Sequence, residues 1–353
     1  MSIILQILGV CFGLGFLIFI HELGHFIGAR LCKVRVLTFA FGFGPDLFKY
    51  VYKGTKYCIK AVPFGGFVAM AGDNHDTASV TGAEGEYLSL PWYKKIFIAF
   101  VGPFANYVLA AVMFCAIFNI YGIATISNTS RIGAIGENYP AAAAGLLNGD
   151  TIKSIDGVNI SFWSEISENL KNKADKQSLF VIERGTATFE VSINVAKNPA
   201  TGSGLIGVSP YIAKEKAGFF KSLRYGIEAP VTQSIMTVAY LADKLFTLEK
   251  PDVAGPIGIM QVMGQAAKRG MEDYLRLIAI ISVALGLFNL FPIPFVDGGM
   301  IILFIVEGIK KSPVGVKTIQ VYNTVGIMII AVIFIFATYS DILRLGVGKF
   351  FGK

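Results

Sequence analysis

The stretch Phe19-Ile20-His21-Glu22-Leu23-Gly24-His25 closes an apolar run near the N-terminus and contains two histidines four residues apart. On an α-helix, residues at this spacing lie on the same face. Two imidazoles on one face can bind a zinc ion, and Glu22 between them can act as general base toward a water on that ion. The chain has three histidines, and this motif uses two of them. Because short motifs also occur by chance, the rest of the chain must supply a third ligand and a path for the substrate.

The run that leads into the motif, Ser2–Ile20, carries no charged residue. A cleaved signal peptide is one interpretation, but no basic segment precedes the run and no A-x-A-like cleavage site follows it. About 20 apolar residues are enough to span a bilayer. We therefore predict a retained first membrane helix, with His21–His25 in its last turns, at or just inside one membrane face.

The composition supports a membrane protein with several spans. Of the 353 residues, 54% are hydrophobic and 16% are charged, and the mean hydropathy is +0.61. These values are too apolar for an ordinary soluble protein. We assign the net charge of +7 to cytoplasmic loops and not to a nucleic-acid partner. The four cysteines form no CxxC pair and suggest no disulfide framework.

Three further uncharged runs are predicted to span the membrane: Ile96–Ile126, Leu277–Val296 and Val321–Tyr339. Lysines and arginines are concentrated between the first two spans, so the positive-inside rule places that loop in the cytoplasm. Charges and Pro230 interrupt Phe219–Thr247, for which we predict an interfacial helix. If that stretch spanned the membrane, Asp297 would finish on the opposite face from the histidines.

The first cytoplasmic loop contains Phe41-Gly-Phe-Gly-Pro45 and Val62-Pro-Phe-Gly-Gly-Phe-Val68. Apolar residues punctuated by Gly and Pro predict short hairpin strands. We expect a membrane-dipping sheet beside the metal, although a peripheral amphipathic loop is the alternative. His75, in Asp73-Asn-His-Asp76, is interpreted as a solvated loop histidine.

Residues from Asn128 to about Tyr211 carry mixed charges, as a soluble domain does. The run from Pro140 to Gly157, with Ala-Gly-Leu, Gly-Asp and Ile-Asp-Gly in order, closely resembles a PDZ domain of the bacterial protease type. PDZ domains can bind an extended segment as an added strand. The predicted division is 1–126 for the membrane region with the metal motif, 127–215 for the PDZ domain, 216–270 for the interfacial helix and linker, and 271–353 for the C-terminal membrane region.

Asp297 is the candidate third ligand. A carboxylate at membrane depth is costly unless it is paired or bound to a metal. The predicted topology brings the ends of the first and third spans to the same side, so one Zn²⁺ could be held by three protein ligands with a fourth position open. Asn289 could hydrogen-bond an unwound substrate strand, or it could simply cap a helix. Asn106, inside the second span, could serve helix packing or lie near the site.

These motifs, with Gly102-Pro-x-x-Asn106 and Gly255-Pro-Ile-Gly258, occur in the order seen in the site-2 protease family of intramembrane zinc metalloproteases, peptidase M50. Over essentially the whole chain the sequence resembles this family, in the type of the bacterial regulator of sigma-E protease. The resemblance implies a polytopic α-helical membrane protein with four transmembrane helices, a membrane-associated β-hairpin region and an inserted α+β PDZ domain. It also implies a multi-pass protein of the bacterial inner membrane, with its active site near the cytoplasmic side and its PDZ domain in the periplasm.

The resemblance further implies cleavage of membrane segments of single-span proteins, such as anti-sigma factors already trimmed outside or remnant signal peptides. The implied metal ligands are His21, His25 and Asp297, with Glu22 as base, and the implied substrate-binding residues are Asn289, Pro292, Pro294, Gly65 and Gly66, with Asn106 in support. Expected partners are such substrates, the lipid bilayer, and a peptide or ectodomain at the PDZ domain, but no nucleic acid.

The chain departs from the family pattern in three places. Val296 replaces the familiar Leu before Asp297, Met300 stands where many relatives have His, and there is room for a single PDZ domain. Two other functions are alternatives: an ion transporter, in which buried His, Glu and Asp handle ions, and a catalytically silent PDZ-bearing scaffold. The first does not account for the PDZ domain, and the intact ligand set with its base argues against the second.

Overall fold

The computed structural model describes residues 3–73, 82–199, 202–247 and 255–344. His75 lies outside this part of the chain. The chain divides into two compact units, one made of residues 1–118 and 218–353 and the other of residues 119–217. The second unit encloses the segment 127–215 that the sequence predicts to be a PDZ domain.

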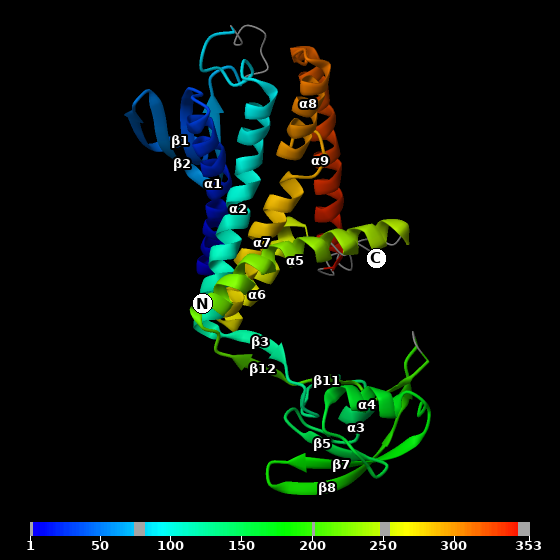
Figure 1. Ribbon diagram of the computed structural model, residues 1–353. Coiled ribbons are helices and arrows are strands. Elements are labelled where there is room, and N and C mark those ends of the chain that lie inside the picture. The colour runs from blue at the N-terminus through cyan, green and yellow to red at the C-terminus, as the bar shows by residue number, and fades with distance from the viewer. Residues whose placement is uncertain (1–2, 74–81, 200–201, 248–254, 345–353) are drawn as a thin grey trace, which may run out of the picture. The chain divides into compact units, whose positions relative to one another are not determined.

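The first unit is mainly helical (Figure 1). Its helices are α1 (Ile3–Leu31), α2 (Trp92–Tyr121), α5 (Phe219–Phe246), α6 (Pro256–Arg269), α7 (Met271–Asn289), α8 (Asp297–Lys310) and α9 (Val316–Arg344). Within the described residues, three segments are long and apolar enough to cross a membrane: Phe12–Leu31, Trp92–Tyr121 and Lys317–Arg344. The chain is thus a membrane protein with helical spans, but the predicted number of four is not confirmed.

The predicted third span, Leu277–Val296, is not one continuous helix. Helix α7 ends at Asn289, residues 290–296 are not helical, and α8 begins at Asp297 (Figure 1). Pro292 and Pro294 lack the backbone N–H that a helix interior needs, which explains the break. The prediction that Asp297 ends a span was therefore wrong, because this residue starts a helix. A carboxylate is favourable in the first turn of a helix.

The first candidate span contains the metal motif. Among the described residues, the first segment that can cross a membrane is Phe12–Leu31, and it includes His21–His25, which the sequence placed in the last turns of the first membrane helix. Helix α1 continues from His25 to Leu31, about 9 Å further along its axis. The helix thus extends beyond the motif, and the expectation that the motif lies at or just inside one membrane face stays a prediction.

The loop after α1 forms two long bent strands, β1 (Val36–Tyr52) and β2 (Thr55–Met70), in place of the predicted short ones. The first half of β1 is paired on both sides, since Phe39 pairs with Val68 and also with Tyr57. Its second half pairs with the first half of β2, with Tyr50 opposite Tyr57. The segments thus lie in the order 46–52, 55–60, 36–41 and 66–70 across the sheet. The chain turns between the halves of β1 at Gly42 (φ +89°), a conformation that residues with a Cβ rarely adopt.

Helix α5 runs across α2 and α7 instead of alongside them (Figure 1). Its buried residues Ser222, Gly226 and Pro230 face the neighbouring helices, and a Cβ on Gly226 would press against the Cys115 backbone of α2. This helix is not one of the three that meet the criteria for a span. Its interfacial location stays a prediction.

The N-terminus of α6 is capped by Asp341, a buried residue of α9. Its carboxylate accepts hydrogen bonds from the N–H groups of Gly255 (3.0 Å) and Gly258 (2.9 Å). These N–H groups belong to the helix start, where the backbone has no partner within the helix. The Gly-Pro-Ile-Gly motif therefore acts as a junction between α6 and the C-terminal span.

The second unit is built on a four-stranded sheet in the order β6-β5-β7-β8. Its elements are β3 (Ile123–Ile126), β4 (Ile132–Ile135), α3 (Pro140–Ala143), β5 (Thr151–Ile155), β6 (Val158–Asn159), α4 (Trp163–Leu170), β7 (Gln177–Arg184), β8 (Ala187–Asn194), β9 (Ala196–Lys197), β10 (Gly204–Leu205), β11 (Val208–Pro210) and β12 (Ile212–Glu215). Strand β3 pairs with β12 and β4 with β11, so the segments that enter and leave the unit are joined. Ile152, Phe180 and Ile182 are fully buried in its core.

Candidate metal centre

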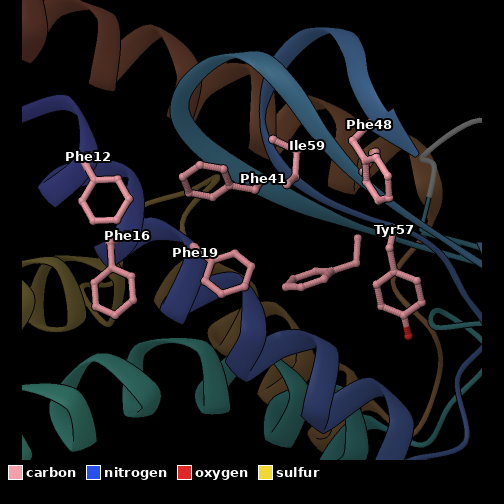
Figure 2. Close-up of a pocket in the computed structure, with 9 residues that line it drawn as sticks. Phe12, Phe16, Phe19, Phe41, Phe48, Tyr57 and Ile59 are labelled. Carbon is pink, nitrogen blue, oxygen red and sulfur yellow. The ribbon is translucent and has the colours of Figure 1, made fainter. Parts of the chain in front are cut away.

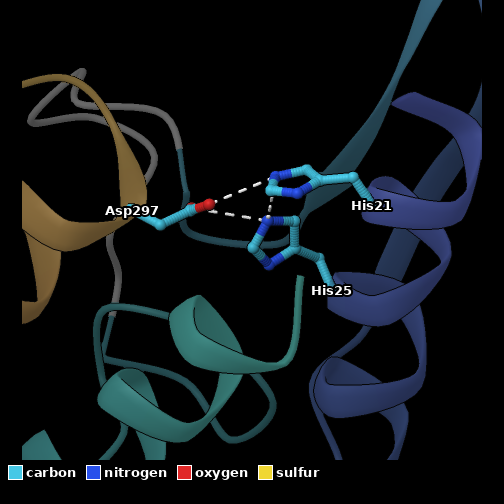
Figure 3. Close-up of side chains that lie close together, drawn as sticks. All are labelled: His21, His25 and Asp297. Atoms are coloured by element: carbon cyan, nitrogen blue, oxygen red, sulfur yellow. Dashed lines mark hydrogen bonds and ion pairs between the residues drawn. The ribbon is translucent and has the colours of Figure 1, made fainter. Parts of the chain in front are cut away.

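Three side chains from two distant parts of the chain meet at one point: His21 and His25 of α1, and Asp297 at the start of α8 (Figure 3). His21 Nε2 lies 3.1 Å from Asp297 Oδ2 and 3.1 Å from His25 Nε2, and His25 Nε2 lies 3.4 Å from Asp297 Oδ1. Around a tetrahedral zinc with bonds of about 2.0–2.1 Å, neighbouring ligand atoms are about 3.4 Å apart. The three donors thus fit a zinc ion in type, number and spacing.

The second ring nitrogen of His25 is held by the backbone of α2. Its Nδ1 lies 2.8 Å from the carbonyl oxygen of Ile98, so Nδ1–H donates and Nε2 presents its lone pair to the metal position, as is usual for a metal-binding histidine. The two helices approach closely because of small residues. A Cβ on Gly102 would overlap the His25 ring, and a Cβ on Gly24 would overlap the carbonyl of Val101.

Asn106 of α2 supports His21 in the same way. This residue is fully buried, its Nδ2 lies 3.4 Å from His21 Nδ1, and its Oδ1 has no hydrogen-bond partner. The oxygen and nitrogen of an amide side chain are assigned from their hydrogen-bond partners. With the two atoms of Asn106 in exchanged positions, Oδ1 accepts a hydrogen bond from His21 Nδ1–H. His21 Nε2 then faces the metal position. Ser282 also donates to the Asn106 carbonyl oxygen (2.9 Å), so Asn106 serves helix packing as well as the site.

Glu22 faces the same cavity as two of the ligands. This cavity has a volume of about 340 Å³, and Glu22, His25 and Asp297 all contribute to its wall. The Val68 N–H of β2 donates a hydrogen bond to the Glu22 carboxylate. On the same strand, a Cβ on Gly66 would lie 3.6 Å from Glu22 Cγ and would overlap the Ala40 carbonyl. The general-base candidate is thus held between α1 and an adjacent strand.

The predicted substrate-binding residues fall into two groups. Gly65 and Gly66 are buried beside α1, next to Glu22. Asn289 is the half-buried last residue of α7, and Pro292 and Pro294 lie in the segment between α7 and Asp297. None of these five residues is among the described residues that line the cavity. Gly66 lies beside Glu22, and the substrate-binding role of all five stays a prediction.

Sequence reasoning missed several residues of the cavity wall, among them Tyr87, Phe295 and Asn323. Asn323 is a polar residue in the apolar helix α9, which is itself a signal for a functional position in a membrane protein. Phe295 has φ +78°, an uncommon conformation for an aromatic residue. Tyr87 offered no such signal, because its position depends on how residues 82–91 pack on the helices. Met300, about one turn after Asp297 in α8, also lines the cavity.

Comparison with a family model and with related sequences gives consistent results over most of the chain. Residues 9–333 match the model of peptidase family M50. A Clostridium acetobutylicum protein is 35% identical over 333 residues, which cover 93% of this chain and 95% of that protein. A Campylobacter jejuni protein is 31% identical over 356 residues, which cover 97% and 94%. The names of both relatives class them provisionally as zinc metalloproteases.

Solved structures match a shorter part. The PDZ domain of an SdrC-like protein from Listeria monocytogenes is 19% identical with a TM-score of 0.22, and covers 25% of this chain and 93% of that domain. Its Listeria innocua counterpart is 22% identical, also with a TM-score of 0.22, and covers 25% and 99%. The PDZ assignment of residues 127–215 continues to rest on the sequence run described above.

Proposed function

The chain belongs to peptidase family M50, and from this premise we propose that it is an intramembrane zinc endopeptidase. His21, His25 and Asp297 would hold one zinc ion, and Glu22 would transfer the proton. The observation that carries the proposal is that Glu22 shares one cavity with two members of the ligand cluster, His25 and Asp297, and that a candidate membrane span contains the motif. A scaffold would not need a base and a ligand set in this arrangement.

The residues of the chain divide the chemistry between them. Zinc, when bound, supplies a Lewis acid that polarises a carbonyl group and acidifies water. Glu22 takes a proton from the attacking water and passes it to the leaving amine. Its carboxylate accepts the Val68 N–H, which orients it while leaving acceptor sites available. Ile98 and Asn106 hold the two imidazoles, so that their Nε2 atoms stay directed at the metal.

The proposed substrates are membrane segments of single-span proteins, of the kind cut by the regulator of sigma-E protease type. A helical segment hides its peptide groups in its own hydrogen bonds, so it must unwind before cleavage. The non-helical segment 290–296 and the strand at Gly65–Val68 flank the site and offer backbone groups to an unwound chain. Asn289 would act at the end of that segment that joins α7, away from the metal.

The proposed location follows from charge and composition. Basic residues between α1 and α2 indicate a cytoplasmic loop, which puts the second unit on the periplasmic side of a bacterial inner membrane. There the PDZ-like domain would contact a trimmed ectodomain or a peptide. With room for a single domain of this kind, a substrate-size filter that depends on two domains is not proposed.

The test compares the wild type with Glu22→Gln, each purified, reconstituted and given a model single-span substrate. Zinc content is measured on both preparations. We expect both proteins to hold zinc and only the wild type to cleave. Cleavage by both would overturn the role of Glu22, and a zinc-loaded wild type that cleaves no tested single-span substrate would favour the scaffold.

A further inference from the structure

A second cavity, of about 400 Å³, lies between α1 and the β1–β2 sheet (Figure 2). Seven of the nine residues that line it are Phe or Tyr, and the other two are Cys58 and Ile59. Tyr57 directs its hydroxyl away from the other labelled rings (Figure 2). This wall offers a water molecule almost no polar partner, whereas an ordered water in a protein usually has two to four. An apolar occupant therefore suits the cavity.

This cavity is separate from the metal centre. Phe12, Phe16 and Phe19 line it from α1, and their spacing of four and then three residues puts them on one helix face. His21 is nine residues after Phe12, which places it about 180° around the helix at about 100° per residue. An occupant of this cavity thus lies on the opposite face of α1 from the ligands and is not the peptide being cut.

The cavity opens toward the bilayer. It lies along the candidate span Phe12–Leu31, and the side chains at its α1 rim are exposed, Phe12 by 67% and Phe16 by 37%. Around a membrane span the surrounding solvent is hydrocarbon. An open apolar recess in that position is therefore filled by an acyl chain.

A cation lies beyond one end of the cavity and on the same face of α1. Arg30 is exposed, its guanidinium carbon lies 5.5 Å from the Phe26 ring centre, and that ring lies 6.0 Å from the ring of Tyr57 in the cavity wall. One guanidinium N–H is used by Thr55 Oγ1 (2.5 Å). Arg has five such donors, and it is well suited to bind phosphate oxygens.

The distance from this cation to the cavity suits a lipid. Phe19 is eleven residues before Arg30, or about 16 Å along the helix axis. Half of the hydrocarbon core of a bilayer is about 15 Å thick. A lipid whose phosphate is level with Arg30 therefore has its chain end at the depth of the cavity.

We propose that this cavity is a phospholipid site, in which one acyl chain lies between α1 and the sheet and the phosphate pairs with Arg30. The bound chain lies against Phe39, the residue whose strand pairs with Val68. Val68 in turn holds Glu22. The lipid thus supports the strand that orients the catalytic carboxylate.

The experiment uses the full-length protein in nanodiscs that contain a phospholipid with a diazirine at the end of one acyl chain. After irradiation, adducts are located by peptide mass spectrometry. We expect them to concentrate on Phe16, Phe19 and their neighbours in the cavity. Val332 of α9, 67% exposed, reports ordinary contact with surrounding lipid. Ile59→Trp fills the cavity and should reduce its adducts to the Val332 level, whereas Val332→Trp should leave the cavity adducts unchanged.

Arg30→Gln tests the phosphate contact without changing the cavity. It should reduce the cavity adducts of the phospholipid probe but not those of an uncharged diazirine-bearing fatty alcohol. Equal labelling of the cavity and of Val332, or cavity adducts that survive Ile59→Trp, would overturn the proposal. Loss of cavity adducts on addition of a single-span model substrate would assign the cavity to a protein helix and would likewise overturn it.

Discussion

Lys95 of α2 and Glu307 of α8 form a buried ion pair, with Nζ 2.5 Å from Oε1. The Lys95 side chain is 2% exposed, and its ammonium also donates to the Leu88 carbonyl oxygen (3.2 Å). Helix α8 begins with the ligand Asp297, and α2 carries the groups that hold the two histidines. The ion pair therefore links α8, which carries Asp297, to α2, which holds the two histidine ligands.

Glu307→Gln should destabilise the protein and weaken zinc retention. Removing one partner of a buried ion pair leaves the other charge uncompensated, which costs about 3–5 kcal/mol. Thermal unfolding in detergent and zinc content after dialysis measure the two effects. The double variant Lys95→Met with Glu307→Leu is the matched control, since an apolar pair of similar size should recover most of the stability. Equal losses in the single and double variants would contradict this account.

Asn106→Leu should weaken zinc binding while the fold persists. The substitution removes the side-chain partner of His21 Nδ1, and loss of such a partner typically lowers metal affinity about 10–100-fold. Competition with a chromogenic chelator gives the affinity. Ser282→Ala is the control, because Ser282 bonds to the backbone oxygen of Asn106 and not to its amide. A similar loss of affinity in both variants would mean that Asn106 acts only through helix packing.

Two glycines of α1 provide a matched test of how closely α1 and α2 must approach. A Cβ on Gly24 would overlap the Val101 carbonyl, whereas a Cβ on Gly28 would lie 3.4 Å from its nearest neighbour, Ile98 Cα. Gly24→Ala should therefore cost about 1–3 kcal/mol through overpacking and lower proteolytic activity, and Gly28→Ala should be close to neutral. Thermal unfolding and a cleavage assay distinguish them. Equal losses of stability and activity in the two variants would show that the position of Gly24 is no more sensitive to an added Cβ than the position of Gly28.

Much of the metal site could be predicted from local patterns. The four-residue spacing fixes His21 and His25 on one helix face, and the cost of a buried charge points to Asp297. The resemblance to a known family added the order of the motifs. Asn106 was a candidate only because polar residues are rare inside spans, and its contact with His21 depends on how α1 and α2 pack.

The rest depends on contacts between distant segments. Hydropathy alone predicts one span over Leu277–Val296, because it contains no information on helix ends. Pro292 and Pro294 end one helix, and Asp297 starts another. The bent course of β1 and β2 follows from pairing on both sides of Phe39, which local alternation does not encode. Tyr87 and Asn323 reach the cavity from segments far from the motif in sequence, so no local pattern could place them there.

The second unit contains a buried carboxylate whose effect on stability should depend on pH. Asp150 is 1% exposed and accepts hydrogen bonds from Arg184 Nε and Nη2, each at 2.8 Å, and from the Leu147 N–H. Burial alone raises the pKa of Asp150, but the Arg184 guanidinium and the Leu147 N–H outweigh it and hold the pKa below its usual range. A depressed pKa in the folded state contributes stability above the unfolded value of about 3.9. That contribution is lost as the pH falls through the folded value.

Asp150→Asn should therefore destabilise this unit at neutral pH, by about 1.5–3 kcal/mol for hydrogen bonds to charged groups. The stability difference between Asp150→Asn and the parent should shrink as the pH falls below about 4, where the unfolded chain begins to bind a proton that the folded carboxylate takes up only at lower pH. The chain has two tryptophans, Trp92 and Trp163, so in a Trp92→Phe background Trp163 fluorescence reports urea unfolding of this unit alone. Glu183→Gln is the control, because its pair with Lys153 is exposed and should contribute little. A difference that stays constant from pH 7 to pH 3 would show that Asp150 acts through its shape and not its charge.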